Sequence, residues 1–178
     1  AYLFATELEN FLMKNGITFV GQPTTVRRLI AENKLKIEKK TNITTYLSPT
    51  LEKIVQPLNL YSINIYAEAF LKILGFEKTG KGTTEAGINV VRRFWENKKI
   101  DLAGFKMTDG CGLSRLDLIT TEQLSRMLYI ISKDSCYSVL YKSLPVAGVS
   151  GTMTNLLQGT VAENNLRAKT GSMSGLRA

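Results

Sequence analysis

The chain has 178 residues, of which 44% are hydrophobic and 21% are charged. These values are typical of a globular protein and argue against intrinsic disorder, a collagen-like repeat and a disulfide scaffold. The length fits one domain, or one domain with an appendage. No apolar run approaches the ~20 residues that a bilayer span needs, so we expect no transmembrane segment.

The charge balance is basic, and histidine is absent. Lys and Arg number 23 against 15 Asp and Glu, which gives a formal charge of +8. Without histidine, the Ser-His-Asp and Cys-His types of catalysis and ordinary zinc sites are excluded within this chain. The two cysteines, Cys111 and Cys136, lack the spacing of a metal site and are expected to be core thiols. We therefore expect no metal and no cofactor, and acid-base chemistry that uses Lys, carboxylates, Tyr or Ser.

Apolar periodicity and turn residues predict a chain in which helices dominate. Ser48-Pro49 is typical of a helix start and Pro57 of an interruption, while Ser62 fits an N-cap and Gly75 a C-cap. A capping box is expected where Thr120 precedes Gln123. The expected helices span residues 2–15, 48–56, 62–74, 84–97, 121–132 and 136–142, with one or two helical turns over 153–157, and the expected extended segments span residues 17–20, 25–31, 43–47 and 166–173.

Two features favour an anionic ligand, though weakly. The segment from Gly75 to Gly82 has the spacing of a phosphate-binding loop, but Gly82 stands where a hydroxyl must bind magnesium. A flexible loop between two helices explains it more simply. The basic stretch from Lys34 to Lys40 fits a solvated edge strand or helix face. Together they leave one alternative function open, a non-catalytic basic module that binds nucleotide or nucleic acid.

Two short motifs point to a different chemistry. One is S-x-N, formed by Ser62 and Asn64 at an expected helix start. The other is K-T-G, which occurs at Lys169 in an extended stretch and also at Lys78 in the glycine-rich segment. On a strand, Gly171 would let a ligand backbone approach closely. The later copy therefore suits an edge strand that receives a peptide.

S-x-N followed by K-T-G forms the second and third elements of the signature of penicillin-binding proteins and serine β-lactamases, whose first element is S-x-x-K. Together with its flanking segments, the chain resembles over nearly its whole length the D-alanyl-D-alanine carboxypeptidase/endopeptidase family of class C low-molecular-mass penicillin-binding proteins. The segments that carry the resemblance are SPTLEKIVQPLNLYSINIYAEAFLKILG, TDGCGLSRLDLIT, SLPVAGVSGTM and LRAKTGSMSGLRA.

The resemblance implies an α+β transpeptidase fold in which helices pack on an antiparallel sheet. Residues 48–178 would be the C-terminal part of that domain, and residues 1–47 a mixed α/β lead-in from the junction with an inserted domain. It also implies a place in the periplasm or the outer cell envelope. The partner would be a peptidoglycan stem peptide ending in D-Ala-D-Ala, with β-lactams as covalent inhibitors, and nucleic acid would not be a partner.

The same resemblance assigns roles to the motif residues. Ser62 would relay a proton to the leaving amine, and Asn64 would hydrogen-bond the substrate amide. Lys169 would orient Ser62 and supply positive potential for the substrate's terminal carboxylate. Thr170 and Ser172 would bind that carboxylate through their hydroxyls, and the Ser172 backbone N–H would be one donor of the oxyanion hole. The peptide would lie along the strand by strand addition.

Three departures from the family pattern stand out. Cys111 replaces the usual Ser and Asp117 the usual Asn, and both are expected to shape their loop. None of the eleven serines is followed by Lys three positions later, so the nucleophile and its lysine base are absent from this chain. The chain alone is therefore expected to be inactive. With the sheet incomplete, the strand over residues 166–173 would leave unpaired backbone groups and favour self-association.

Overall fold

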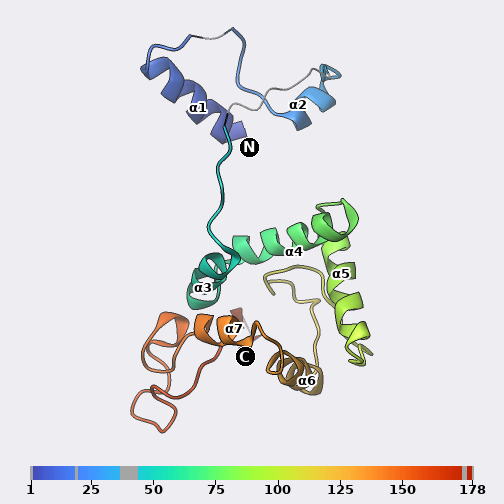
Figure 1. The fold of residues 1–178 in the computed structure, drawn as a ribbon, viewed down its shortest axis with the longest axis vertical. Coiled ribbons are helices and arrows are strands. Elements are labelled where there is room, and N and C mark those ends of the chain that lie inside the picture. Colours follow the sequence, from blue (N-terminus) through green and yellow to red (C-terminus); the bar gives the residue numbers. More distant parts are fainter. Residues whose placement is uncertain (1, 19, 37–43, 174–175, 178) are drawn as a thin grey trace. The chain divides into compact units, whose positions relative to one another are not determined.

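The computed structural model describes residues 2–18, 20–36, 44–173 and 176–177 (Figure 1). The chain forms two compact units, Ala1–Leu47 and Ser48–Ala178. That the first unit is the lead-in from an inserted domain stays a prediction. Among the described residues, no helix is long and apolar enough to cross a membrane.

The first unit holds two helices, α1 (Tyr2–Lys14) and α2 (Val26–Ala31). The helix expected over residues 2–15 is confirmed, but the extended segment expected over 25–31 is wrong. Thr25 caps α2, because its side chain accepts a hydrogen bond from the Arg28 backbone N–H, and this cap selects the helix over a strand. Residues 17–18 and 44–47 form no strand; positions 19 and 43 of those two expected segments, and 37–40 of the basic stretch, lie outside the described residues.

The second unit is built mainly from helices (Figure 1). The helices expected over 84–97, 121–132 and 136–142 are confirmed, and so is the capping box of Thr120 and Gln123, in which each backbone N–H donates to the other residue's side chain. Near residues 153–157, helical structure is confined to a short 3-10 turn that starts earlier. The elements are α3 (Leu51–Tyr61), α4 (Asn64–Thr79), α5 (Thr84–Asn97), α6 (Thr121–Ile131), α7 (Tyr137–Ser143), the 3-10 turn η1 (Gly151–Met153), β1 (Ser172–Met173) and β2 (Leu176–Arg177).

The boundaries predicted for α3 are wrong. The helix starts at Leu51, after the N-cap Thr50, and continues through Pro57. Packing against α7 outweighs the local preference of proline. Asn59, two residues further on, donates from Nδ2 to the buried Ser143 Oγ at 2.7 Å and so ties α3 to α7.

The C-cap predicted at Gly75 is also wrong, because α4 runs on to Thr79 and ends at Gly80. Gly75 is buried where α4 meets α5. A Cβ at Gly75 would lie 2.8 Å from Gly87 N, and one at Gly87 would lie 2.1 Å from Leu71 O. The two glycines thus allow a close helix contact. Since residues 75–79 are helical and follow a helix, they do not form a phosphate-binding loop.

The strand expected over residues 166–173 forms only in part. Arg167 makes an isolated antiparallel bridge with Val146, and β1 pairs with β2 in antiparallel register. A second isolated bridge joins Lys106 and Leu118. In the described ranges the two short strands and these two bridges are all the β structure, so the antiparallel sheet that the family resemblance implied is not seen here. A small core of Ile100, Leu102 and Met127 packs with Trp95, Phe105 and Ile130 instead.

Candidate active site

Ser62 occupies an unusual backbone position between α3 and α4. Its φ and ψ are 56° and 53°, in the left-handed region, and its N–H caps α3 by donating to Leu58 O. The N-cap role expected for Ser62 is wrong, because Ile63 is the N-cap residue of α4. Helix ends of this geometry usually carry glycine, and another residue costs about 1 kcal/mol. A side chain retained at such a position is consistent with a functional constraint.

Lys169 lies against this serine although the two residues are far apart in sequence. Its Nζ donates to Ser62 Oγ at 2.8 Å and to Thr170 O at 2.6 Å. Desolvation lowers the pKa of Lys169 below its ordinary value. The predicted proximity of Ser62 and Lys169 is therefore confirmed, whereas their roles in catalysis stay predictions.

The second K-T-G copy lies elsewhere on the unit. Lys78 is in the last turn of α4, whereas Asn64 is the first residue of that helix. At 1.5 Å per residue, the two positions are about 21 Å apart along the helix axis. Lys78 is thus remote from Ser62.

The other predicted site residues are sequence neighbours of Ser62 or Lys169. Asn64 follows Ser62 by two positions and is exposed; in the part of the chain that the structure describes, its side chain makes no hydrogen bond. Thr170 is half-buried, and its Oγ1 donates to Thr152 Oγ1 at 2.8 Å. Gly171 and Ser172 are exposed, and Ser172 begins β1.

A short backbone ladder holds the K-T-G segment in place. Ala147 N donates to Leu166 O at 2.9 Å, and Ala168 N donates to Pro145 O at 3.1 Å. Pro145 and Ala147 are fully buried, so this side of the ladder is anchored in the unit. Residues 143–153 form one of the segments that carry the family resemblance, but that resemblance assigned a role to none of their side chains. Thr152 lies in this segment and was not predicted as a site residue, because it belongs to neither S-x-N nor K-T-G.

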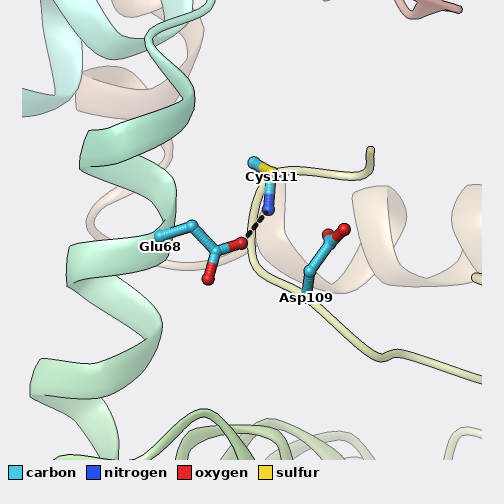
Figure 2. Close-up of side chains that lie close together, drawn as sticks. All are labelled: Glu68, Asp109 and Cys111. Atoms are coloured by element: carbon cyan, nitrogen blue, oxygen red, sulfur yellow. Dashed lines mark hydrogen bonds between the residues drawn. The ribbon is translucent and has the colours of Figure 1, made fainter. Parts of the chain in front are cut away.

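The loop after α5 is fixed by carboxylates (Figure 2). Figure 2 shows Glu68 reaching from α4 toward the loop that carries Asp109 and Cys111. Glu68 Oε1 accepts from the backbone N–H groups of Gly110 and Cys111 at 2.6 and 3.0 Å. Asp109 accepts from the N–H of Ser114 at 2.7 Å. Through these hydrogen bonds the two carboxylates anchor the loop.

The same cluster brings together three groups that can ligate metals. One ligand atom each of Glu68, Asp109 and Cys111 lies within 4.8 Å of the others. Burial raises the pKa of Cys111, and both carboxylates act in the same direction. A protonated thiol is a poor ligand, so the cluster is better suited to shaping the loop. Asp117 does the same nearby, because its Oδ1 accepts from both the N–H and the hydroxyl of Thr108 at 2.7 Å.

All 178 residues match the sequence model of one peptidase family. The chain belongs to the D-Ala-D-Ala carboxypeptidase 3 (S13) family. Among its relatives, the D-alanyl-D-alanine carboxypeptidase of Actinomadura sp. (strain R39) is 37% identical over 138 residues, which are 75% of this chain and 26% of the relative. The penicillin-sensitive carboxypeptidase A of Dictyostelium discoideum is 32% identical over 139 residues, 74% of this chain and 26% of the relative.

Solved structures agree at the level of the fold. Penicillin binding protein 4 from Haemophilus influenzae superimposes with a TM-score of 0.86 at 24% identity, covering 98% of this S13-family chain and 37% of the neighbour. A complex of that protein with a β-lactam gives a TM-score of 0.83, covering 96% and 38%. The chain spans about a quarter of the length of the curated relatives it matches.

Proposed function

We propose that this chain supplies part of the active site of a serine D-Ala-D-Ala carboxypeptidase or endopeptidase that cleaves peptidoglycan stem peptides. The observation that carries the proposal is the hydrogen bond from Lys169 Nζ to Ser62 Oγ, which joins the S-x-N and K-T-G motifs. Family membership supports the reaction class. The site would act in the periplasm or the outer cell envelope.

The proposed chemistry is acyl transfer through an ester intermediate. A serine hydroxyl attacks the carbonyl of the penultimate D-Ala, the amide C–N bond breaks, and the terminal D-Ala leaves as an amine. The lysine base takes the proton of the attacking serine. Ser62 relays it, giving its own hydroxyl hydrogen to the leaving amine and taking the one from the lysine. The Lys169 ammonium polarises the Ser62 hydroxyl by donating to its oxygen, which favours release of the proton. Water then hydrolyses the ester and regenerates the serine.

Substrate binding uses the segment that follows Lys169. Thr170 and Ser172 would hydrogen-bond the terminal carboxylate, while the Lys169 charge makes the site attractive to that anion. Gly171 has no side chain and would allow the peptide to lie close to the backbone. Asn64 would hold the substrate amide, which is consistent with its exposure and with its free side chain among the described residues. A β-lactam would acylate the same serine.

The attacking serine and its lysine base would come from a longer protein that contains this chain, because no S-x-x-K occurs in the sequence. The lengths of the relatives support this part of the proposal. The antiparallel sheet of the α+β fold would be completed by the same additional residues. The isolated chain would then neither cleave D-Ala-D-Ala peptides nor react with penicillin.

Fluorescent penicillin labelling tests this function. We expect the longer protein to form a covalent adduct of one penicillin per molecule, measured by intact mass, and the 178-residue chain to form none. A folded longer protein that takes up no penicillin would refute the proposed function. Stoichiometric acylation of the 178-residue chain would refute the external nucleophile.

A further inference from the structure

Thr152 has no role in the site described so far, yet it contacts one of its residues. Its Oγ1 accepts the hydrogen bond from Thr170 Oγ1 at 2.8 Å, and both side chains are half-buried. We propose, on the basis of the function above, that Thr152 is a positioning residue that orients the Thr170 hydroxyl toward the substrate's terminal carboxylate.

The hydroxyl pair can reverse its donor direction without moving heavy atoms. A threonine hydroxyl has one hydrogen to donate and two lone pairs to accept. In the structure, Thr170 gives its hydrogen to Thr152. A carboxylate accepts only, so Thr170 must turn its hydrogen toward a bound carboxylate. Thr152 then donates to Thr170, and Thr170 donates to the carboxylate. The two hydrogen bonds point in the same direction, so each strengthens the other by polarisation.

The turn that carries Thr152 is held on both sides. Gly151 has φ +55°, and a Cβ at this residue would lie 2.2 Å from Leu60 O, so η1 lies directly against the end of α3. On the other side, Gly148 N donates to Met153 O at 3.0 Å, and Met153 is buried. Since Ser62 is the C-cap of α3, the turn that bears Thr152 packs against the same helix end that bears Ser62. Thr152 is therefore placed where it can fix a hydroxyl rotamer.

The test compares two forms of one ligand on the longer protein. Benzylpenicillin carries the carboxylate that Thr170 would bind, and its methyl ester does not. We expect Thr152→Val, which replaces the hydroxyl by a methyl group of similar size, to slow acylation by benzylpenicillin about tenfold. Acylation by the methyl ester is expected to change less than about twofold. Equal loss with both ligands, or no loss with either, would overturn the proposal.

Matched variants separate positioning from folding. Thr154→Val removes a hydroxyl two residues away that donates to Gly151 O at 2.9 Å, and it should leave both rates unchanged. Thr152→Ser keeps the hydroxyl, so benzylpenicillin should acylate this variant at the wild-type rate, even if Thr152→Val lowers the Tm. A serine variant that is acylated as slowly as the valine variant would contradict the proposal. If wild type takes up no penicillin, the proposed function fails; if wild type reacts and Thr152→Val reacts equally, only this inference fails.

Discussion

Lys169 and Ser62 are 107 positions apart, and the Lys169 Nζ lies 2.8 Å from Ser62 Oγ. The serine sits at a strained helix end, and the lysine at the end of a ladder anchored by buried residues. Residues so far apart in sequence come within hydrogen-bond distance only when the chain folds. The contact is thus a product of tertiary structure, and it is the feature on which the functional proposal rests.

The first prediction concerns the pH dependence of acylation. Lys169 must stay protonated to donate to Ser62, and desolvation lowers its pKa. Activity that needs this ammonium is present below the lowered pKa and is lost as pH rises through it. The rate of penicillin acylation by the longer protein should therefore fall at a pH below the ordinary pKa of lysine. Lys169→Arg should move this alkaline limb upward, because arginine keeps its proton.

The matched control is Lys142→Arg, which makes the same exchange at an exposed position of α7. It should leave the pH profile unchanged. An alkaline limb at the same pH in wild type and Lys169→Arg would show that a different group titrates.

The second prediction concerns backbone strain at Ser62. Ser62→Ala and Ser62→Gly both remove the hydroxyl, but only glycine adopts a φ of 56° without steric cost. We expect the glycine variant to be more stable by about 1 kcal/mol, measured from the denaturant midpoints of the longer protein. Ser125 in the interior of α6 provides the reverse control, since glycine there should be less stable than alanine by about 1 kcal/mol. Alanine as stable as glycine at position 62 would contradict the assigned backbone.

The third prediction concerns the contact between α4 and α5. A Cβ at Gly87 would lie 2.1 Å from Leu71 O, so Gly87→Ala must push the two helices apart. We expect a loss of about 3 kcal/mol in the free energy of unfolding, seen as a lower denaturant midpoint. Gly82→Ala serves as the control, because a Cβ there would meet atoms only at 3.8 Å and beyond. Equal stability of the two variants would rule out the close crossing.

The fourth prediction concerns the isolated chain. Large apolar side chains of the second unit are exposed, among them Ile65, Phe76 and Tyr129 at 73%, 57% and 66%. Such surfaces drive association in water. Sedimentation of the 178-residue chain should therefore show oligomers that grow with concentration. A monomer that melts in one cooperative transition would contradict this expectation and show that the helices bury a sufficient core by themselves.

The sequence predicted the elements whose signals are local. The capping box at Thr120 and the uninterrupted apolar pattern of α5 define their helices without help from the rest of the fold. The errors occur where packing decides. Pro57 stays inside α3 because that helix packs against α7, and Gly75 stays inside α4 because Gly87 allows a close contact. The spacing of residues along the chain does not identify α7 or Gly87 as the packing partner.

The same division holds for the site. Ser62 and Lys169 belong to motifs of fixed spacing, so they could be selected from the sequence. The sequence showed no sign of the left-handed backbone of Ser62, because serine is common at N-caps and was predicted to be one here. Nor did it point to Thr152, whose only distinction is a hydroxyl that meets Thr170 after folding.

The most direct test of the central claim is the release of D-Ala from a short peptide ending in D-Ala-D-Ala. We expect Ser62→Ala in the longer protein to lower kcat/KM by a factor on the order of 10² to 10⁴, as for the loss of a proton-transfer group. Ser125→Ala, which removes an exposed hydroxyl of α6, should release D-Ala at the wild-type rate. Wild-type kcat/KM in Ser62→Ala would contradict the claim that the serine held by Lys169 acts in the reaction.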